Sequence, residues 1–395
     1  MANLEIKKGI FWVGAVDWNV RTFHGRTYNT NRGTTYNAYL ILDDKITLID
    51  AVYGPFAGEL IEKIGSIVNP GKIDYIVANH VETDHSGALP AVMKLCPKAK
   101  IFGTAKCKEG LQKHYHQDWD FQIVKTADKL SLGKRELSFI EAPMIHWPDS
   151  MFTYCPQEKL LFPNDAFGQH LASSERFDDQ ISDCVLMDEA EKYYANILWP
   201  LGAVIAKKLQ ELTKSNLAIG MIAPSHGIIW RNQPEKIINA YSSWVKNETE
   251  NKAVIIYETM WGATEKMARK ILEGLEDAGA KAALFDISLS DRTEVVKAMF
   301  EAKAYLIGSS THDNGMLPNL AGFMEFVKGL KPQNRLAAVF GSYGWAGGAI
   351  KEIENTLSQA GIKISQPSLG VQYVPDEAQE KLCFNFGREF AKNLS

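Results

Sequence analysis

The stretch Asn79-His80-Val81-Glu82-Thr83-Asp84-His85-Ser86-Gly87 decides how the rest of this 395-residue chain is interpreted. It follows directly on an apolar run, IDYIVA at 73–78, which is typical of a strand. Two imidazoles and two carboxylates occur within six positions, and residues 80, 82 and 84 would point to one side of an extended segment. Because so many polar groups do not suit a packed core, the stretch predicts a metal site just after a strand.

Three further candidate ligands stand at similar places along the chain. They are His146 in MIHWPDS (144–150), Asp165 in PNDAFGQH (163–170) and His226 in APSHG (223–227). Each comes just after an apolar run and near proline or glycine, where a rigid sheet presents functional groups on loops. Either histidine by itself would also fit a core, capping or turn position. Together with the first cluster, they complete a set of seven ligands that suits two metals sharing one carboxylate.

The chemistry of this set favours iron without excluding zinc. Four imidazoles and three carboxylates form a hard nitrogen and oxygen set, which suits iron better than a thiolate site would. Histidine and carboxylate sites also bind zinc well, so the ligand types leave the metal open. The five cysteines are scattered and contain no C-x-x-C pair, which argues against a thiolate site and a disulfide framework.

The composition argues against several other classes of protein. With 43 lysines and arginines against 47 aspartates and glutamates, the formal net charge is −4, which provides no basic footprint for nucleic acid or a membrane surface. The N-terminus has no apolar segment of signal-peptide length, and no stretch approaches the ~18 apolar residues of a membrane span. We therefore expect a protein of a reducing compartment, most simply the cytoplasm, with neither nucleic acid nor membrane as a partner.

The chain divides into two halves of different pattern, predicted as residues 1–250 and 251–395. All but one of the nine histidines lie in the first half, and the polar run KNETENK at 246–252 has the character of a linker. In the first half, strands at 36–42 and 46–50 flank an Asp-Asp turn, which predicts a hairpin. Helices are expected at 56–67 and 88–95, and the mixture of elements predicts α/β layers.

The second half alternates strands and helices regularly. Apolar runs at 253–257, 282–285, 304–307 and 336–340 are typical of strands buried on both faces. Helix-length pieces separate these runs, beginning with 264–278. This alternation predicts a doubly wound parallel sheet, a fold that binds its ligands at the carboxyl ends of the strands.

Three loops at those carboxyl ends carry the candidate cofactor-binding residues. The loop ETMWGAT (258–264) leads into a helix, which suits a phosphate, and the absence of a Walker or G-x-G-x-x-G pattern favours a monophosphate. The loops GSSTHDNG (308–315) and GSYGWAGG (341–348) offer glycines for close approach and aromatic rings for stacking. A plain strand–turn–helix and surface aromatics are the alternatives. The candidates are Thr259, Met260, Trp261, Gly262, Ala263, Thr264, Ser309, Thr311, Asn314, Gly315, Ser342, Tyr343, Gly344, Trp345 and Gly347.

On these motifs the sequence resembles a known family over essentially its whole length. The H-x-[EH]-x-D-H run, followed by His, Asp and His, is similar to the metallo-β-lactamase fold, but Glu82 stands where the hydrolases of that fold carry histidine. The loop at 259–264 resembles the flavodoxin pattern T/S-x-T-G-x-T, with Trp261 in place of the middle hydroxyl residue. Together these features resemble the flavodiiron proteins, also known as A-type flavoproteins. The resemblance implies an N-terminal metallo-β-lactamase-like αβ/βα sandwich followed by a C-terminal flavodoxin-like doubly wound parallel sheet.

The same resemblance implies which residues bind the cofactors. One iron would be bound by His80, Glu82, His146 and Asp165, and a second by Asp84, His85, Asp165 and His226, with Asp165 bridging. FMN would occupy the three loops of the second half. As candidates for hydrogen bonding or proton delivery near the irons we name His24, His170 and Tyr194, although an ordinary packing role for Tyr194 is an equal alternative.

The implied activity is the reduction of O2 to water, of NO to N2O, or of both, at a non-haem diiron site that receives electrons through FMN. No cysteine-ligated rubredoxin-like segment follows in the sequence, so we expect a separate electron donor, a rubredoxin or alternatively a reduced deazaflavin. The family also implies a head-to-tail homodimer, possibly paired into a tetramer. Two alternatives are a dizinc hydrolase of thioesters, lactones or phosphodiesters, and a flavodoxin-like electron-transfer or binding module with an inert metal domain.

Overall fold

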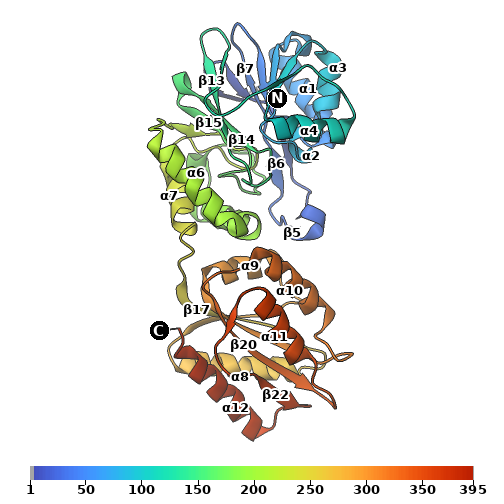
Figure 1. The fold of residues 1–395 in the computed structure, drawn as a ribbon, viewed down its shortest axis with the longest axis vertical. Helices are drawn as coiled ribbons and strands as arrows, with labels where there is room; N and C mark the ends of the chain where they lie inside the picture. Colours follow the sequence, from blue (N-terminus) through green and yellow to red (C-terminus); the bar gives the residue numbers. More distant parts are fainter. Residues whose placement is uncertain (1–3, 395) are drawn as a thin grey trace. The chain divides into compact units, whose positions relative to one another are not determined.

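The structure, a computed structural model, describes residues 4–394 and consists of two compact units (Figure 1). The first unit contains the chain up to Phe23, Thr30–Tyr193 and Leu201–Val245. The second contains His24–Asn29, Tyr194–Pro200 and the chain from Lys246 onward. The sequence predicts a single boundary at residue 250. In the structure, two short segments from before that boundary belong to the second unit.

The first unit is a sandwich of two sheets. The first sheet has the order β1-β2-β7-β8-β9-β10-β11, antiparallel up to β8 and parallel from β8 to β11. Its strands are Leu4–Lys7, Ile10–Trp12, Tyr39–Ile41, Thr47–Ile49, Tyr75–Val77, Lys100–Gly103 and Phe121–Ile123. The second sheet runs β12-β13-β14-β15-β16, with strands Lys129–Ser131, Glu136–Glu141, Met151–Cys155, Leu160–Phe162 and Met221–Ile222. The antiparallel pair β7 and β8 confirms the predicted hairpin.

Alternation along the strands separates the core of this unit into layers. Tyr39 and Ile41 of β7 point between the two sheets, whereas Leu40 points to the outer side, where α1, α3 and α4 cover the sheet. On the far side of the second sheet, buried Leu209 and Tyr241 lie beside Phe152 of β14. Figure 1 shows α1, α3 and α4 on one flank of the unit and α6 and α7 on the other, which confirms the predicted αβ/βα arrangement.

The helices of this unit include the two predicted at 56–67 and 88–95, which begin and end within one residue of the predicted positions. The helices are α1 (Ala57–Ile67), α2 (Thr83–Ser86), α3 (Leu89–Leu95), α4 (Ala105–Tyr115), α5 (Asp183–Tyr193), α6 (Gly202–Lys214) and α7 (Pro234–Trp244). Short strands β3 (Ala15–Asp17) and β6 (Thr34–Tyr36) form a separate ribbon, and β4 comprises Thr22–Phe23.

The second unit is a parallel sheet with helices on both faces, as predicted. Its strand order is β18-β17-β19-β20-β21, with β22 also paired to β20. The strands are β17 (Glu250–Glu258), β18 (Lys281–Asp286), β19 (Ala302–Ser310), β20 (Leu336–Tyr343), β21 (Lys363–Ile364) and β22 (Leu369–Gln372). The helices are α8 (Ala263–Asp277), α9 (Arg292–Glu301), α10 (Pro318–Leu330), α11 (Ala349–Gln359) and α12 (Glu377–Ala391). A short β5 (Tyr28–Asn29) and the turn Tyr194–Leu198 also belong to this unit.

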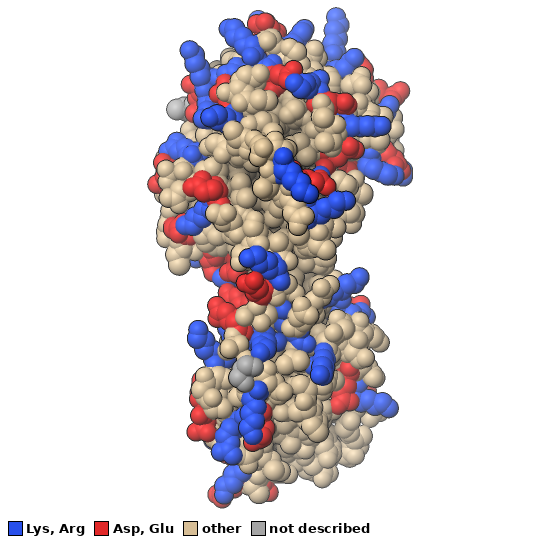
Figure 2. Space-filling view, turned by 60° about the vertical axis from the view of Figure 1, so that its left-hand side comes forward, with Lys and Arg blue, Asp and Glu red and all other residues tan. Residues whose placement is uncertain are grey.

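The surface matches the nearly balanced composition. In Figure 2, Lys and Arg side chains are interspersed with Asp and Glu side chains over the face in view. Such mixing of the two signs does not favour polyanions. Among residues 4–394, no helix combines the length and the apolar character that crossing a membrane requires.

Two glycines allow α8 and α12 to cross closely on one face of the parallel sheet of the second unit. A Cβ atom at Gly274 would overlap the carbonyl oxygen of Phe384, and one at Gly387 would overlap the carbonyl oxygen of Ile271. In both cases the obstacle is backbone, which cannot rotate away as a side chain would. Close packing here therefore depends on the missing side chains.

We predict opposite effects for two glycine-to-alanine substitutions in this unit. Gly274→Ala should lower the free energy of unfolding by about 1–3 kcal/mol, because the methyl group forces the two helices apart. Gly329→Ala on α10 is the matched control, since a Cβ there meets open space and alanine favours the helix by about 0.5–1 kcal/mol. Urea unfolding of both variants tests the prediction, and equal stability of the two would contradict it.

Candidate metal centre and ligand pocket

The seven candidate ligands converge at one end of the two sheets in the first unit. His80 and Glu82 follow β9, and Asp84 and His85 lie on α2. The other three lie on loops of the second sheet: His146 before β14, Asp165 after β15 and His226 after β16. One part of the sequence prediction is wrong, because residues 80, 82 and 84 do not line one side of an extended segment. Helix α2 begins at Thr83 and turns Asp84 away from Glu82.

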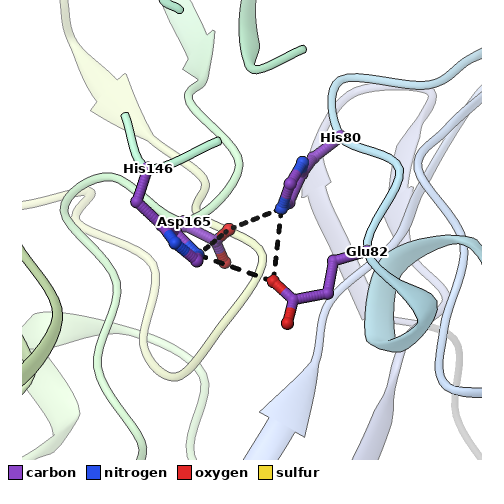
Figure 3. A group of neighbouring side chains, drawn as sticks. All are labelled: His80, Glu82, His146 and Asp165. Carbon is purple, nitrogen blue, oxygen red and sulfur yellow. Dashed lines mark hydrogen bonds and ion pairs between the residues drawn. The ribbon is translucent and has the colours of Figure 1, made fainter. Parts of the chain in front are cut away.

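The ligands form two groups, and Asp165 faces both. In the first group, shown in Figure 3, His80 Nε2 lies 3.3 Å from Glu82 Oε2, and His146 Nε2 lies 3.4 Å from Asp165 Oδ2. One donor atom from each of its four residues lies within 4.8 Å of the others.

The second group lies on the other side of the Asp165 carboxylate. His226 Nε2 is 3.2 Å from Asp84 Oδ2, and His85 Nε2 is 3.4 Å from Asp84 Oδ1. Asp165 Oδ1 is 3.0 Å from His85 Nε2 and 3.6 Å from His226 Nε2, so each carboxylate oxygen of Asp165 faces one group.

Buried atoms in this cluster lack the partners that protein groups would normally supply. Oδ1 of Asp84, Oδ2 of Asp165 and both ring nitrogens of His85 are buried without a hydrogen bond among the described residues. Leaving such groups buried and unpaired is costly, whereas a cation between them satisfies several at once. The nitrogen and oxygen donors therefore fit two metal ions, one in each group.

The electrostatics of the cluster also favour added positive charge. Burial alone would raise the pKa of the Asp165 carboxyl, but the positive charge of His85 and the close approach of the His146 and His85 imidazoles outweigh it and lower the pKa. Burial would lower the pKa of His85, yet the charges of Asp165 and Asp84 raise it to about 9. Without metal the His85 imidazole thus holds a proton, which a metal must displace on binding.

Further residues orient the histidines. The Asp149 carboxylate lies 3.1 Å from His80 Nδ1 and accepts a hydrogen bond from the backbone N–H of Val81 at 2.7 Å. His226 Nδ1 lies 2.6 Å from the carbonyl oxygen of Thr35. Both contacts involve Nδ1 and leave Nε2 facing the ligand group. A partner on the second ring nitrogen is usual for a metal-binding histidine. The sequence prediction missed these partners, although Asp149 stands three residues after His146.

A buried carboxylate, Asp50, connects the two loops that carry His80 and Asp165. Asp50 directly follows β8 and accepts hydrogen bonds from the backbone N–H of Asn79 at 2.7 Å and from its side-chain amide at 3.0 Å. A third bond, at 3.3 Å, comes from Asn164 Nδ2. Asn79 and Asn164 directly precede His80 and Asp165, so one carboxylate sets the relative position of both ligands. Burial raises the pKa of Asp50, and the bonds from Asn79 offset this only in part.

The three residues predicted near the irons lie in different places. His170 is buried, with Nδ1 2.9 Å from Thr34 Oγ1 and its ring centroid 4.8 Å from that of His226. His24 lies on an exposed turn that belongs to the second unit. Tyr194 also belongs to the second unit, where its ring lies 5.5 Å from that of Phe300.

The structure brings a tyrosine that the sequence prediction did not select to the metal groups. The ring of Tyr193 lies 5.1 Å from that of His170 and 6.4 Å from that of His226. The two adjacent tyrosines therefore have different surroundings, and only the direction in which each points from the end of α5 distinguishes them.

The second unit contains a cavity of about 520 Å³ at the carboxyl ends of β17, β19 and β20. Most of the predicted cofactor-binding residues line it: Met260, Trp261, Ala263, Thr311, Asn314, Ser342, Tyr343, Gly344 and Trp345. The prediction missed Ser310, Asp313, Ala346, Tyr373 and Val374. The last two follow β22, whose apolar character was too weak to mark it as a strand.

Most of the other predicted cofactor-binding residues make hydrogen bonds that keep the loops of this pocket in position. Thr264 Oγ1 lies 2.9 Å from Ser310 Oγ and 2.8 Å from Ser342 Oγ, so it ties two lining residues to the start of α8. The backbone N–H of Gly262 donates to Thr259 Oγ1 at 3.0 Å. Ser309 Oγ accepts from the backbone N–H of Leu317 at 3.0 Å. Gly315 and Gly347 lie on the same loops outside the lining.

Comparison with known proteins agrees with this two-part architecture. A family model described as ODP family beta lactamase matches residues 34–227, and a flavodoxin model matches residues 255–387. The chain is 53% identical over 394 residues to a nitric oxide reductase of Moorella thermoacetica, covering 99% of each chain.

Solved structures agree over the full length. Rubredoxin oxygen:oxidoreductase from Desulfovibrio gigas has a TM-score of 0.97 and 39% identity, covering 100% of this chain and 98% of that one. The flavodiiron protein from Giardia intestinalis has a TM-score of 0.95 and 34% identity, covering 100% and 97%.

We predict that Asp50→Asn loosens the metal centre although Asp50 is not a ligand. An amide offers one acceptor oxygen and turns an NH2 group toward a donor, so the free energy of unfolding should fall by about 1–3 kcal/mol. Metal affinity should fall by about 10- to 100-fold, as for other partners outside the ligand set. Metal titration and urea unfolding measure both effects.

Asp44→Asn, at an exposed position in the turn of the same hairpin, is the control and should change stability by less than about 0.5 kcal/mol. An Asp50→Asn protein that binds metal as tightly as the wild type would contradict the positioning role.

Proposed function

This chain belongs to the flavodiiron proteins, the family that includes nitric oxide reductases and rubredoxin oxygen:oxidoreductases, and we infer which part of the reaction each of its two units carries out. The chain is an oxidoreductase that reduces NO to N2O, O2 to water, or both. The observation that carries this proposal is the pair of ligand groups sharing Asp165, in a chain whose second unit has a flavodoxin pocket.

We propose that His80, Glu82 and His146 hold one iron, that Asp84, His85 and His226 hold the other, and that Asp165 joins them. The Nε2 atoms face the groups because Asp149 and Thr35 occupy the Nδ1 sides of His80 and His226. When bound, iron supplies a site for the diatomic gas and a store for electrons. The set of nitrogen and oxygen donors supports iron, and the named relatives are oxidoreductases, so the dizinc hydrolase alternative is disfavoured.

Aromatic rings pack beside the second ligand group, whose residues are buried. The rings of Phe23 and Tyr36 lie 5.8 Å and 6.0 Å from that of His226. For delivery of protons we propose His170, supported by its contact with Thr34, together with Tyr193. For His24 and Tyr194 such a role stays a prediction on sequence grounds alone.

The pocket of the second unit is proposed to bind FMN. The loop at 259–264 enters α8, whose N-terminus favours the phosphate. Trp261 and Trp345 are 87% and 91% exposed at the rim, where they are free to cover a flat ring. A bound flavin accepts electrons in pairs and releases them singly, which suits a relay to a metal centre.

We propose a separate electron donor, a rubredoxin or alternatively a reduced deazaflavin, and a head-to-tail homodimer, possibly paired into a tetramer. The name of the Desulfovibrio gigas relative supports the first of these donors. A cytoplasmic location is supported by the five cysteines, all of which are free thiols in the structure.

We predict about two irons and one FMN per chain after anaerobic purification, and loss of the iron pair on Asp165→Ala. Removal of the shared carboxylate should reduce O2 and NO consumption by at least about 100-fold, since even groups outside the ligand set are worth up to about 100-fold. FMN content and flavin reduction by the donor should not change. Metal analysis, absorption spectra and gas electrodes provide these measurements.

Asp120→Ala, at an exposed position of the same unit, serves as the control and should match the wild type. Two zincs in the wild-type protein would exclude the oxidoreductase proposal. Retention of full gas consumption by the Asp165→Ala protein would show that the metal groups are not where the gas reacts.

We predict that adjacent glycines in the third flavin loop differ in their tolerance of alanine. A Cβ at Gly348 would overlap the carbonyl oxygen of Asn314 and push away a loop that lines the pocket. A Cβ at Gly347 meets no atom closer than 3.5 Å. Gly348→Ala should therefore raise the dissociation constant for FMN about tenfold, equivalent to about 1.4 kcal/mol, and Gly347→Ala should leave it nearly unchanged. Equal FMN affinity of the two variants, measured by fluorescence titration, would refute this placement of the flavin.

A further inference from the structure

Two tyrosines lead from the second ligand group toward the surface of the first unit. The ring of Tyr36 lies 6.0 Å from that of His226, and the ring of Tyr53 lies 5.6 Å from that of Tyr36. Tyr36 is buried, whereas Tyr53 is 41% exposed. The three rings thus form a short series of oxidisable or conducting groups between a buried redox site and solvent.

Tyr36 also has a nearby acceptor for its phenolic proton. Its hydroxyl donates to Oδ2 of Asp17 at 3.3 Å, while Oδ1 of Asp17 is occupied by the backbone N–H groups of Asn19 and Val20. Burial and then the charge of Asp17 raise the pKa of Tyr36, so the phenol is protonated in the resting protein. Removing an electron from a buried phenol expels its proton, and Asp17 is positioned to take it.

Tyr53 stands on the segment that contacts the helix carrying two of the ligands. It directly precedes the short helix Gly54–Phe56, which packs against α2, and the adjacent Val52 accepts a hydrogen bond from Ala88 at 2.9 Å. Backbone contacts therefore fix the position of Tyr53 beside α2.

We propose that Tyr36 and Tyr53 supply single electrons to the metal centre when O2 arrives and the flavin is already oxidised. The proposal rests on the proposed O2 reduction. Complete reduction of O2 to water needs four electrons and four protons. A fully reduced protein with two irons and one FMN holds four electrons, and with the flavin oxidised it is two electrons short.

The electrons and protons of this transfer balance in the following steps. Tyr36 gives one electron to the centre and its phenolic proton to Asp17. Tyr53 then returns one electron to Tyr36, Asp17 returns the proton, and the phenolic proton of Tyr53 passes to water. The exposed Tyr53 radical takes a hydrogen atom from a thiol in solution. Two such passes supply the two missing electrons and convert two thiols to one disulfide.

The experiment uses the iron- and FMN-loaded protein under a deliberate shortage of electrons. The protein receives two electrons per chain from dithionite without oxygen, and is then mixed with air-saturated buffer containing a nitroso spin trap and no thiol. Peptide mass spectrometry locates the trap. In the wild type we expect the trap on Tyr53, and we expect it to be lost when four electrons per chain are supplied.

Tyr36→Phe is the decisive variant, because it leaves Tyr53 exposed but removes the oxidisable phenol between it and the metal centre. We expect loss of the trap from Tyr53 in this variant, and the same loss in Asp17→Asn, which keeps the Tyr36 ring and removes the proton acceptor. Tyr75→Phe, a partly buried tyrosine on β9, is the matched control and should retain labelling at Tyr53. Iron and FMN contents show whether each variant keeps its cofactors.

Two labelling results and one activity result overturn the proposal. Labelling of Tyr53 in Tyr36→Phe at the wild-type level would show direct attack from solution. Labelling of Trp147, whose ring lies 5.2 Å from that of His80, in place of Tyr53 would assign the route to another residue. If the loaded protein consumes no O2, both the proposed O2 reduction and this path are overturned. If it consumes O2 and labelling of Tyr53 is unchanged in Tyr36→Phe, the path alone is overturned.

Discussion

The attraction between buried carboxylates and imidazoles around Asp165 is the interaction on which the first unit depends. Each oxygen of Asp165 faces one ligand group, and the pKa values of Asp165 and His85 move in opposite directions because each group stabilises the charge of the other. Such a cluster is tolerable inside a protein only when its charges are balanced. The surrounding fold therefore holds seven side chains from several loops in positions where cations complete the balance.

The sheets meet this requirement through groups that touch no metal. Asp50 ties the residues before His80 and Asp165, and Asp149 fixes the ring of His80. These carboxylates stand at the ends of strands or in the loops between them, where backbone N–H groups are available. The pocket of the second unit is built differently, because most of its lining side chains are hydroxyl, aromatic and aliphatic groups, with Asp313 as a charged residue among them. A largely uncharged lining with an aromatic rim suits a large planar cofactor, and the carboxylate cluster suits small cations.

Most regular elements were predictable because their signals are local. The hairpin at β7 and β8 and the buried strands of the second unit follow from short apolar runs and turn residues. The prediction failed where geometry depends on a turn: Asp84 was placed on an extended segment, yet helix α2 begins one residue earlier. It also selected Tyr194 rather than Tyr193, since adjacent tyrosines have the same composition signal and point in different directions from a helix end. Tyr373 and Val374 reach the pocket from a strand too short and too polar to mark.

By itself the sequence determined the chemistry available to this protein: which side chains can bind iron, which loops can approach a flavin, and which halves of the chain carry them. Ligand type and the spacing of short motifs are properties of neighbouring residues, so they can be recognised without knowledge of the fold. Only the tertiary structure decided which oxygen of Asp165 faces each ligand group, that Asp50 joins two of the ligand loops, and that Tyr36 and Tyr53 lie in series from His226 to solvent. These relations join residues distant in sequence, and packing of the two sheets and their loops is what brings them within a few ångströms.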